Sequence, residues 1–135
     1  MAAIAELDDV LAPKTVAGMI AALPLAGSAS HAIYSGSEIM MFLPQRVLLP
    51  VENATSDVRP GELAYYHIQA GAHYGWSDDA SELCRFYDED AAPSMPGGPV
   101  AVSVFGRFTT GWSEFVAICR AMRTEGAKQM RVERA

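Results

Sequence analysis

The sequence predicts a mainly β protein with two helices, of the α+β class, in a single domain that spans residues 1–135. Three observations support this prediction. Only two stretches have the helical spacing of apolar residues, and they stand near the two ends of the chain. Between them lie short runs of strand-forming residues separated by Gly- and Pro-rich turns. Because strands and helices do not alternate regularly, a doubly wound parallel sheet is disfavoured and a mostly antiparallel sheet or barrel fits best.

The chain is expected to begin with a short strand over residues 2–7, followed by a helix that starts near Pro13. Proline suits the first turn of a helix because its missing N–H would have no partner there. The range 16–23 then carries apolar residues at i, i+3, i+4 and i+7, which is one face of a helix. Pro24 ends this predicted helix.

A β-hairpin is predicted next, because two strand-like runs, 31–34 and 38–43, flank the small residues 35–37. The remaining loops, strands and second helix are predicted from composition and from the spacing of apolar residues. Residues 44–60 and 69–82 are rich in turn formers and are predicted to be loops. Further strands are predicted at 63–68, 83–87, 100–105 and 128–133, and a second helix over 112–122 that ends near Gly126.

The acidic balance of the chain excludes some classes of partner. Ten basic and sixteen acidic residues give a net charge of −6, which argues against nucleic acid and against anionic membranes. The acidic run 88–90 is interpreted as a solvated loop. No targeting or membrane-spanning segment is recognised. Cys84 and Cys119 have no CxxC or Cys-His spacing, so both are predicted to be reduced core residues of a cytoplasmic protein.

The usual motifs of cofactor, metal and nucleophile sites are missing. The three histidines have no HxH or HxxxH spacing, and no set of convergent zinc ligands is recognisable, so no metal is predicted. No glycine-rich phosphate loop occurs, and no cofactor is predicted. His31 is the candidate of greatest interest, because imidazole can act as a base or as a hydrogen-bond donor in a pocket. The alternative is a histidine whose hydrogen bonds are satisfied on the sheet surface.

Several stretches taken together resemble a family of uncharacterised bacterial proteins with the cyclophilin-like fold, distant relatives of the prolyl isomerases. Residues 6–9 leading into 12–15 look like the strand-to-helix entry of cyclophilins. The range 34–38 looks like the family's aromatic-Ser-Gly-x-Glu turn, and the most specific match is Glu-Asn-Ala-Thr-Ser at 52–56, followed by 60–66. The resemblance covers nearly the whole chain and implies a closed or nearly closed barrel flanked by two helices.

Two departures from the family pattern bear on function. In cyclophilins a catalytic arginine follows the histidine that corresponds to His31, whereas this chain has Ala32 there. This change argues against prolyl isomerase activity. The resemblance also implies an extra strand and hairpin before residues 2–7. A chain that starts at Met1 would leave a sheet edge unpaired, so we expect a homodimer or an upstream start.

The leading functional hypothesis is a small-molecule-binding protein or an accessory protein of bacterial catabolism. Its pocket is expected to contain the candidate catalytic residue and four ligand-binding residues, namely His31, Tyr34, Asn53, Thr55 and Tyr66. Asn53 and Thr55 are chosen because they lie in the segment most similar to the family. One alternative is a cofactor-independent enzyme that acts on a small carboxylate or amide, with His31 as general base. Residual prolyl isomerisation is the third.

Overall fold

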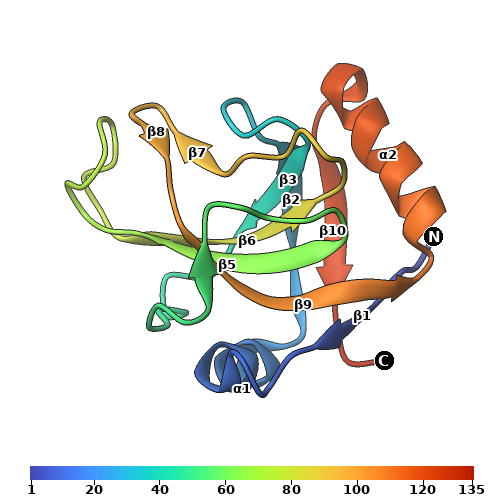
Figure 1. The fold of residues 1–135 in the computed structure, drawn as a ribbon, viewed down its shortest axis with the longest axis horizontal. Helices are drawn as coiled ribbons and strands as arrows, with labels where there is room; N and C mark the ends of the chain where they lie inside the picture. Colours follow the sequence, from blue (N-terminus) through green and yellow to red (C-terminus); the bar gives the residue numbers. More distant parts are fainter.

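A computed structural model describes residues 1–135, and its main feature is a strongly curled antiparallel sheet with two helices packed against it (Figure 1). The strand order in the sheet is β1-β9-β5-β6-β3-β2-β10, with β4 added beside β9. A separate short hairpin pairs β7 with β8. The elements are β1 (Ile4–Leu7), α1 (Pro13–Ala22), β2 (Leu25–His31), β3 (Glu38–Phe42), β4 (Ala54–Thr55), β5 (Glu62–Ile68), β6 (Ala80–Phe86), β7 (Ser94–Met95), β8 (Gly98–Pro99), β9 (Val102–Thr110), α2 (Trp112–Glu125) and β10 (Lys128–Val132).

The prediction of a mainly β protein with two helices is confirmed, but the barrel is not closed. The two outer strands, β1 and β10, each pair with a single neighbour, β9 and β2 respectively, and not with each other. A barrel needs its first and last strands to be hydrogen-bonded to one another. The expected closed or nearly closed barrel is therefore corrected to an open half-barrel.

Helix α1 covers the larger part of the core. It starts at Pro13 as predicted and buries an apolar stripe that includes Val16 and Met19. These side chains belong to a core cluster with residues of β2, β3, β5, β6 and β9. The helix has no capping side chain of its own. The carboxylate of Glu52 accepts hydrogen bonds from the backbone N–H groups of Lys14 (3.1 Å) and Thr15 (2.7 Å) instead.

Helix α2 packs on a second core cluster. Its buried residues are Phe115, Cys119 and Met122, which confirms the predicted stripe, and it ends before Gly126, whose φ of 85° is left-handed. Cys84 and Cys119 are both free and buried, as the sequence predicts. Neither helix is long and apolar enough to cross a membrane.

The first strand of the predicted hairpin lies earlier in the chain than expected. β2 covers residues 25–31 and pairs with both β3 and β10, whereas residues 32–37 form the connection to β3. Alanine, glycine and serine dominate β2 and have low strand propensity, so pairing on both sides overrides the local preference. Ile33 is 85% exposed as a consequence.

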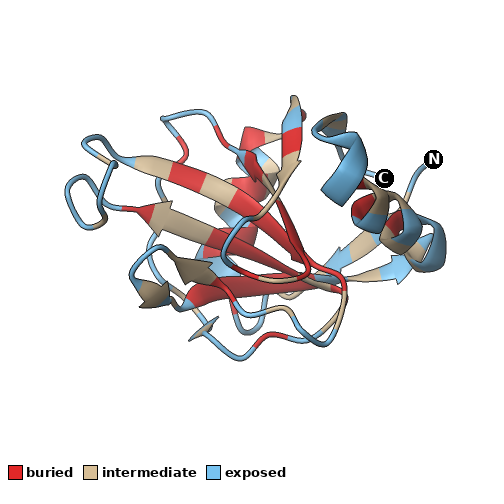
Figure 2. Ribbon diagram, turned by 90° about the horizontal axis from the view of Figure 1, so that it is seen from above, coloured by how far each residue is buried: buried red, intermediate tan, exposed pale blue.

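Alternation along β6 creates two faces with different environments. Leu83 and Arg85 point toward the helices, whereas Glu82 and Cys84 point to the opposite, outer face, because successive side chains of a strand alternate. The central strands carry most of the buried residues, and the solvent side of α2 is exposed (Figure 2). The cleft and the side-chain cluster described below lie at these two faces.

Candidate functional site

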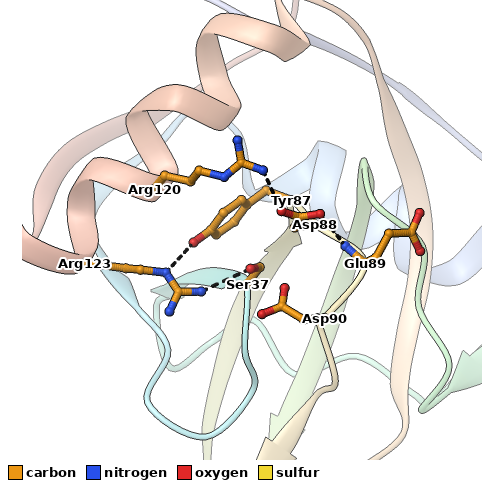
Figure 3. A pocket seen from close by; sticks show the side chains of 7 residues that line it. All are labelled: Ser37, Tyr87, Asp88, Glu89, Asp90, Arg120 and Arg123. Atoms are coloured by element: carbon orange, nitrogen blue, oxygen red, sulfur yellow. Dashed lines mark hydrogen bonds and ion pairs between the residues drawn. The ribbon is translucent and has the colours of Figure 1, made fainter.

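A polar cleft lies between α2, the turn before β3 and the segment that follows β6 (Figure 3). Its volume is about 400 Å³, which is within the range of small-molecule sites. All but one of the lining residues are polar or charged. They are Ser37, Tyr87, Asp88, Glu89, Asp90, Arg120 and Arg123.

A hydrogen-bonded chain centred on Tyr87 forms the floor of this cleft. Tyr87 is only 2% exposed, and its Oη lies 2.7 Å from Nε2 of His31 and 3.0 Å from Nε of Arg123. His31 Nδ1 lies 2.8 Å from the carbonyl oxygen of Ala32, which can only accept, so Nδ1 carries the proton. In the neutral imidazole Nε2 then accepts from the Tyr87 hydroxyl, which itself accepts from Arg123.

Arg123 is held in place by neutral groups. Its Nε donates to Tyr87 and its Nη2 donates to Oγ of Ser37 at 3.1 Å. It takes part in none of the ion pairs of the structure. A guanidinium has five N–H donors, so Arg123 keeps unused donors beside the cleft and a positive charge that no ion pair neutralises.

The acidic residues of the cleft differ in whether they are paired. Asp88 forms an ion pair with Arg120. The hydrogen bond from Arg120 and then the backbone N–H of Glu89 lower the pKa of Asp88, with a smaller contribution from the charge of Arg123. Asp90 forms no ion pair, and its carboxylate lies across the cleft from Arg123, with Ser37 between them (Figure 3).

Two of the residues predicted from the sequence, His31 and Tyr34, do not line this cleft. His31 is the last residue of β2 and stands behind Tyr87, with its ring edge-on to the tyrosine ring at a centroid distance of 5.7 Å. Tyr34 lies in the connection between β2 and β3, and its side chain is 57% exposed without a hydrogen bond. The cleft therefore reaches His31 only through Tyr87.

The other three predicted residues lie elsewhere on the sheet. Asn53 has a left-handed φ of 46°, and its Nδ2 donates to the Val104 carbonyl at 2.9 Å, which holds the β4 segment on β9. Thr55 accepts at Oγ1 from the backbone N–H of Asp57 (2.9 Å). Tyr66, on β5, lies at a second cavity of about 280 Å³. No hydrogen bond or ring contact joins these three residues to His31, and His31 lines neither of the two cavities described here. Their role in ligand binding stays a prediction.

The hydroxyl group of Tyr66 is hydrogen-bonded to a histidine. Its Oη lies 3.0 Å from Nε2 of His73, which belongs to the loop between β5 and β6. Burial, followed by the charges of Glu82 and Cys84, raises the pKa of Tyr66. Tyr66 therefore lies close to the acidic cluster on the outer face of β6.

This cluster consists of Glu38, Glu82 and Cys84, whose potential ligand atoms all lie within 4.8 Å of one another. Burial, and then the neighbouring Glu38, raises the pKa of Glu82 to about 7 despite the opposing effect of Cys84. Burial also raises the pKa of Glu38 and of the Cys84 thiol. These are the residues of the chain that are grouped so that they could hold a metal ion.

The sequence contained signals for both groups that sequence reasoning did not use. Arg120 and Arg123 stand three residues apart on the polar side of a predicted helix, which places both on one face. Glu82 and Cys84 stand two residues apart in a strand, which also places them on one face. Tyr87 and Ser37 carried no signal, because only the fold brings them to α2.

The open, curled antiparallel sheet and its two helices define a mainly β half-barrel protein with a polar cleft beside its second helix. The chain matches the model of the family described as "Protein of unknown function (DUF3830)" over residues 1–133. It belongs to this family. No protein with a curated description matches the chain.

Proposed function

We propose that this protein binds a small molecule in the cleft beside α2, and that the ligand carries a carboxylate. The observation that supports the proposal is the guanidinium of Arg123, which is fixed by Tyr87 and Ser37 but has no carboxylate partner. An arginine with free N–H groups and a fixed orientation suits the two oxygens of a carboxylate, which it can bind in bidentate fashion. Fixing the side chain before binding also reduces the entropy lost on binding.

Asp90 adds a second requirement to the ligand. Its carboxylate lies opposite Arg123 across the cleft and forms no ion pair, so it can accept from an ammonium or amide N–H group of the ligand (Figure 3). A ligand with a carboxylate at one end and an N–H donor at the other would neutralise both residues. The proposed class is therefore small aminocarboxylates and amides of small carboxylic acids.

The experiment is a titration of the isotope-labelled protein with four small probe molecules. The backbone N–H signals of Ser37, Asp90 and Arg123 in the NMR spectrum report binding. β-Alanine and N-acetylglycine carry both groups, acetate carries only the carboxylate, and methylammonium carries only the cation. We expect the first two to shift these signals at lower concentration than either single-group probe. Equal or absent shifts with all four probes would contradict the proposal.

Variants separate binding from folding. Arg123→Gln removes the unpaired charge and is expected to weaken binding by about tenfold or more, since hydrogen bonds between charged groups contribute about 1.5–3 kcal/mol. Arg107→Gln is the matched control, because Arg107 is exposed on β9 and does not line the cleft. Unchanged binding in Arg123→Gln, with a native circular dichroism spectrum, would exclude the cleft as the site.

The hydrogen bond between His31 and Tyr87 favours a second candidate function, a cofactor-independent enzyme that acts on a small carboxylate or amide. In this candidate function the Tyr87 hydroxyl faces the substrate, and His31 accepts its proton as the general base behind it. His31→Ala is then expected to abolish turnover while the protein still folds. Turnover at the original rate in this variant would rule out the role of His31.

We also infer a cyclophilin-like relationship within bacteria, a cytoplasmic location and a homodimer. Support for the homodimer comes from the two outer strands of the sheet, β1 and β10, whose free edges can pair with another chain. Size-exclusion chromatography with light scattering is expected to give twice the chain mass of 14.5 kDa. A monomeric mass would reject the homodimer and leave the ligand proposal unaffected.

A further inference from the structure

The outer face of the sheet carries a group of potential metal ligands that is separate from the cleft. Cys84 and Glu82 are two residues apart on β6, and Glu38 comes from the neighbouring strand β3. The register pairs Met40 with Cys84 and Phe42 with Glu82, so the three ligand residues share one face. Their carboxylate oxygens and sulfur lie within 4.8 Å of one another.

The hydrogen-bond donors near these groups are too few to satisfy them. The Cys84 thiol has a single proton and directs it to Oε1 of Glu82, at 3.6 Å. The hydroxyl of Ser35 donates to the Ser94 carbonyl at 3.2 Å. Glu38 is only 3% exposed, and the groups that hydrogen-bond to it are the same Cys84 thiol and Ser35 hydroxyl. It must therefore share their single protons with Glu82 and with the Ser94 carbonyl, although buried carboxyl groups need partners. A proton shared between the carboxyl groups, or a cation bound by all three residues, would satisfy them.

No cationic side chain of the protein forms an ion pair with the carboxyl groups of this cluster. Arg85 follows Cys84 directly but points to the opposite face of β6, toward the helices. The ion pairs of the structure include neither Glu38 nor Glu82. The charge of Arg85 has only a small effect on Glu38 and Cys84, smaller than that of their burial. Burial of two carboxyl groups and a thiol in one place, without a positive charge that pairs with them, is unfavourable unless they are protonated or coordinate a metal ion.

We propose that Glu38, Glu82 and Cys84 bind a divalent transition-metal ion of the zinc type. Sulfur selects zinc, cobalt or iron over magnesium and calcium, which prefer oxygen ligands alone. Three protein ligands are also the number found in catalytic zinc sites, which keep one position open for water or substrate. Glu82 is only partly buried, which gives an ion a route from solvent.

Cobalt(II) chloride is the probe for this site, because cobalt replaces zinc and gives a charge-transfer absorption band when a thiolate is a ligand. The wild-type protein is expected to bind one cobalt ion per chain and to show this band. Cys84→Ala is expected to abolish the band. Cys119→Ala is the matched control and should retain it, because Cys119 is the other buried free cysteine and lies outside the cluster. Glu82→Gln is expected to weaken zinc binding by roughly tenfold or more.

The same measurements define the results that would overturn the proposal. Absence of the band in the wild-type protein would show that the cluster is satisfied by protons. A band that persists in Cys84→Ala, or that disappears in Cys119→Ala, would place the metal elsewhere. If Cys84→Ala fails to fold by circular dichroism, Cys84→Ser takes its place. The serine variant must also lose the band, because an alcohol oxygen gives no thiolate absorption.

Discussion

Replacement of Arg85 by methionine is expected to stabilise the protein, although the change removes a fully buried side chain. Arg85 is 2% exposed, and its Nε and Nη2 atoms have no hydrogen-bond partner. Burial lowers its pKa from 12.5 to about 10, against smaller opposing effects of Cys84, Cys119 and Glu38. The guanidinium is therefore charged at neutral pH in a place that compensates the charge only in part.

The magnitude follows from the difference between these two pKa values. One pKa unit corresponds to about 1.4 kcal/mol, so the buried charge costs up to about 3 kcal/mol. Since the pKa in the folded state is the lower one, this cost is fully present below pH 10 and is relieved as the pH rises through 10. Methionine keeps an unbranched apolar chain in the same space. The free energy of unfolding of Arg85→Met is expected to rise by about 1 to 3 kcal/mol.

Urea unfolding at neutral pH, followed by tryptophan fluorescence and repeated by circular dichroism, measures this change. Coincident transitions by the two probes establish that the free energies can be compared. Arg107→Met is the control, because Arg107 is exposed and its replacement should change stability by no more than about 0.5 kcal/mol. If Arg85→Met were less stable than the wild type while the control was unchanged, the guanidinium would have a partner and the reasoning would be refuted.

Three further predictions concern a helix cap, a turn and the hydroxyl group at the floor of the cleft. Hydrogen bonds from the first turn of α1 outweigh the effect of desolvation and lower the pKa of Glu52. Glu52→Gln should therefore lower the thermal unfolding midpoint at neutral pH, whereas at a pH below the pKa of Glu52 in the folded protein the midpoint should not change. Calorimetry at both pH values measures the difference. Gly36→Ala should lower the free energy of unfolding in urea by at least about 2 kcal/mol, because the new Cβ would overlap the Asp90 carbonyl oxygen. Gly71 has a similar φ but open space around it, so Gly71→Ala should lower this free energy by only about 1 kcal/mol. Equal losses would refute the overlap. Tyr87→Phe should cost about 1–3 kcal/mol, since its two hydrogen-bond partners lose the shared oxygen, and an unchanged urea midpoint would refute this role.

Most of the secondary structure could be predicted because its signals are local. The apolar stripe of α1 and the proline at its start depend only on residues within a few turns, and so does the stripe of α2. The alternating residues of β9 are equally local, although the strand extends to residue 110, beyond the predicted end at 105. β2 was misplaced because its small residues have no strand preference of their own and depend on β3 and β10.

The candidate sites could be predicted only in part. His31 was chosen from the chemistry of imidazole, and the structure places it in a hydrogen-bonded chain with Tyr87. Tyr87 lies 56 residues from His31 along the chain, and no local sequence pattern predicts a contact over that separation. The five residues predicted to share one pocket lie apart in the structure. Similarity of a sequence segment to a family does not show which side chains lie on the same face or at the same end of a sheet.

The amino-acid sequence thus determines the class of this protein, the positions of its helices and its acidic character, from which we expect no nucleic-acid partner. Each of these depends on composition or on short-range periodicity, which can be recognised without knowledge of the fold. The openness of the sheet, the charge left unpaired at Arg123 and the meeting of Glu38 with Glu82 and Cys84 depend on strand register and helix packing. Long-range pairing sets those features, because each requires two segments far apart in the chain to share a surface.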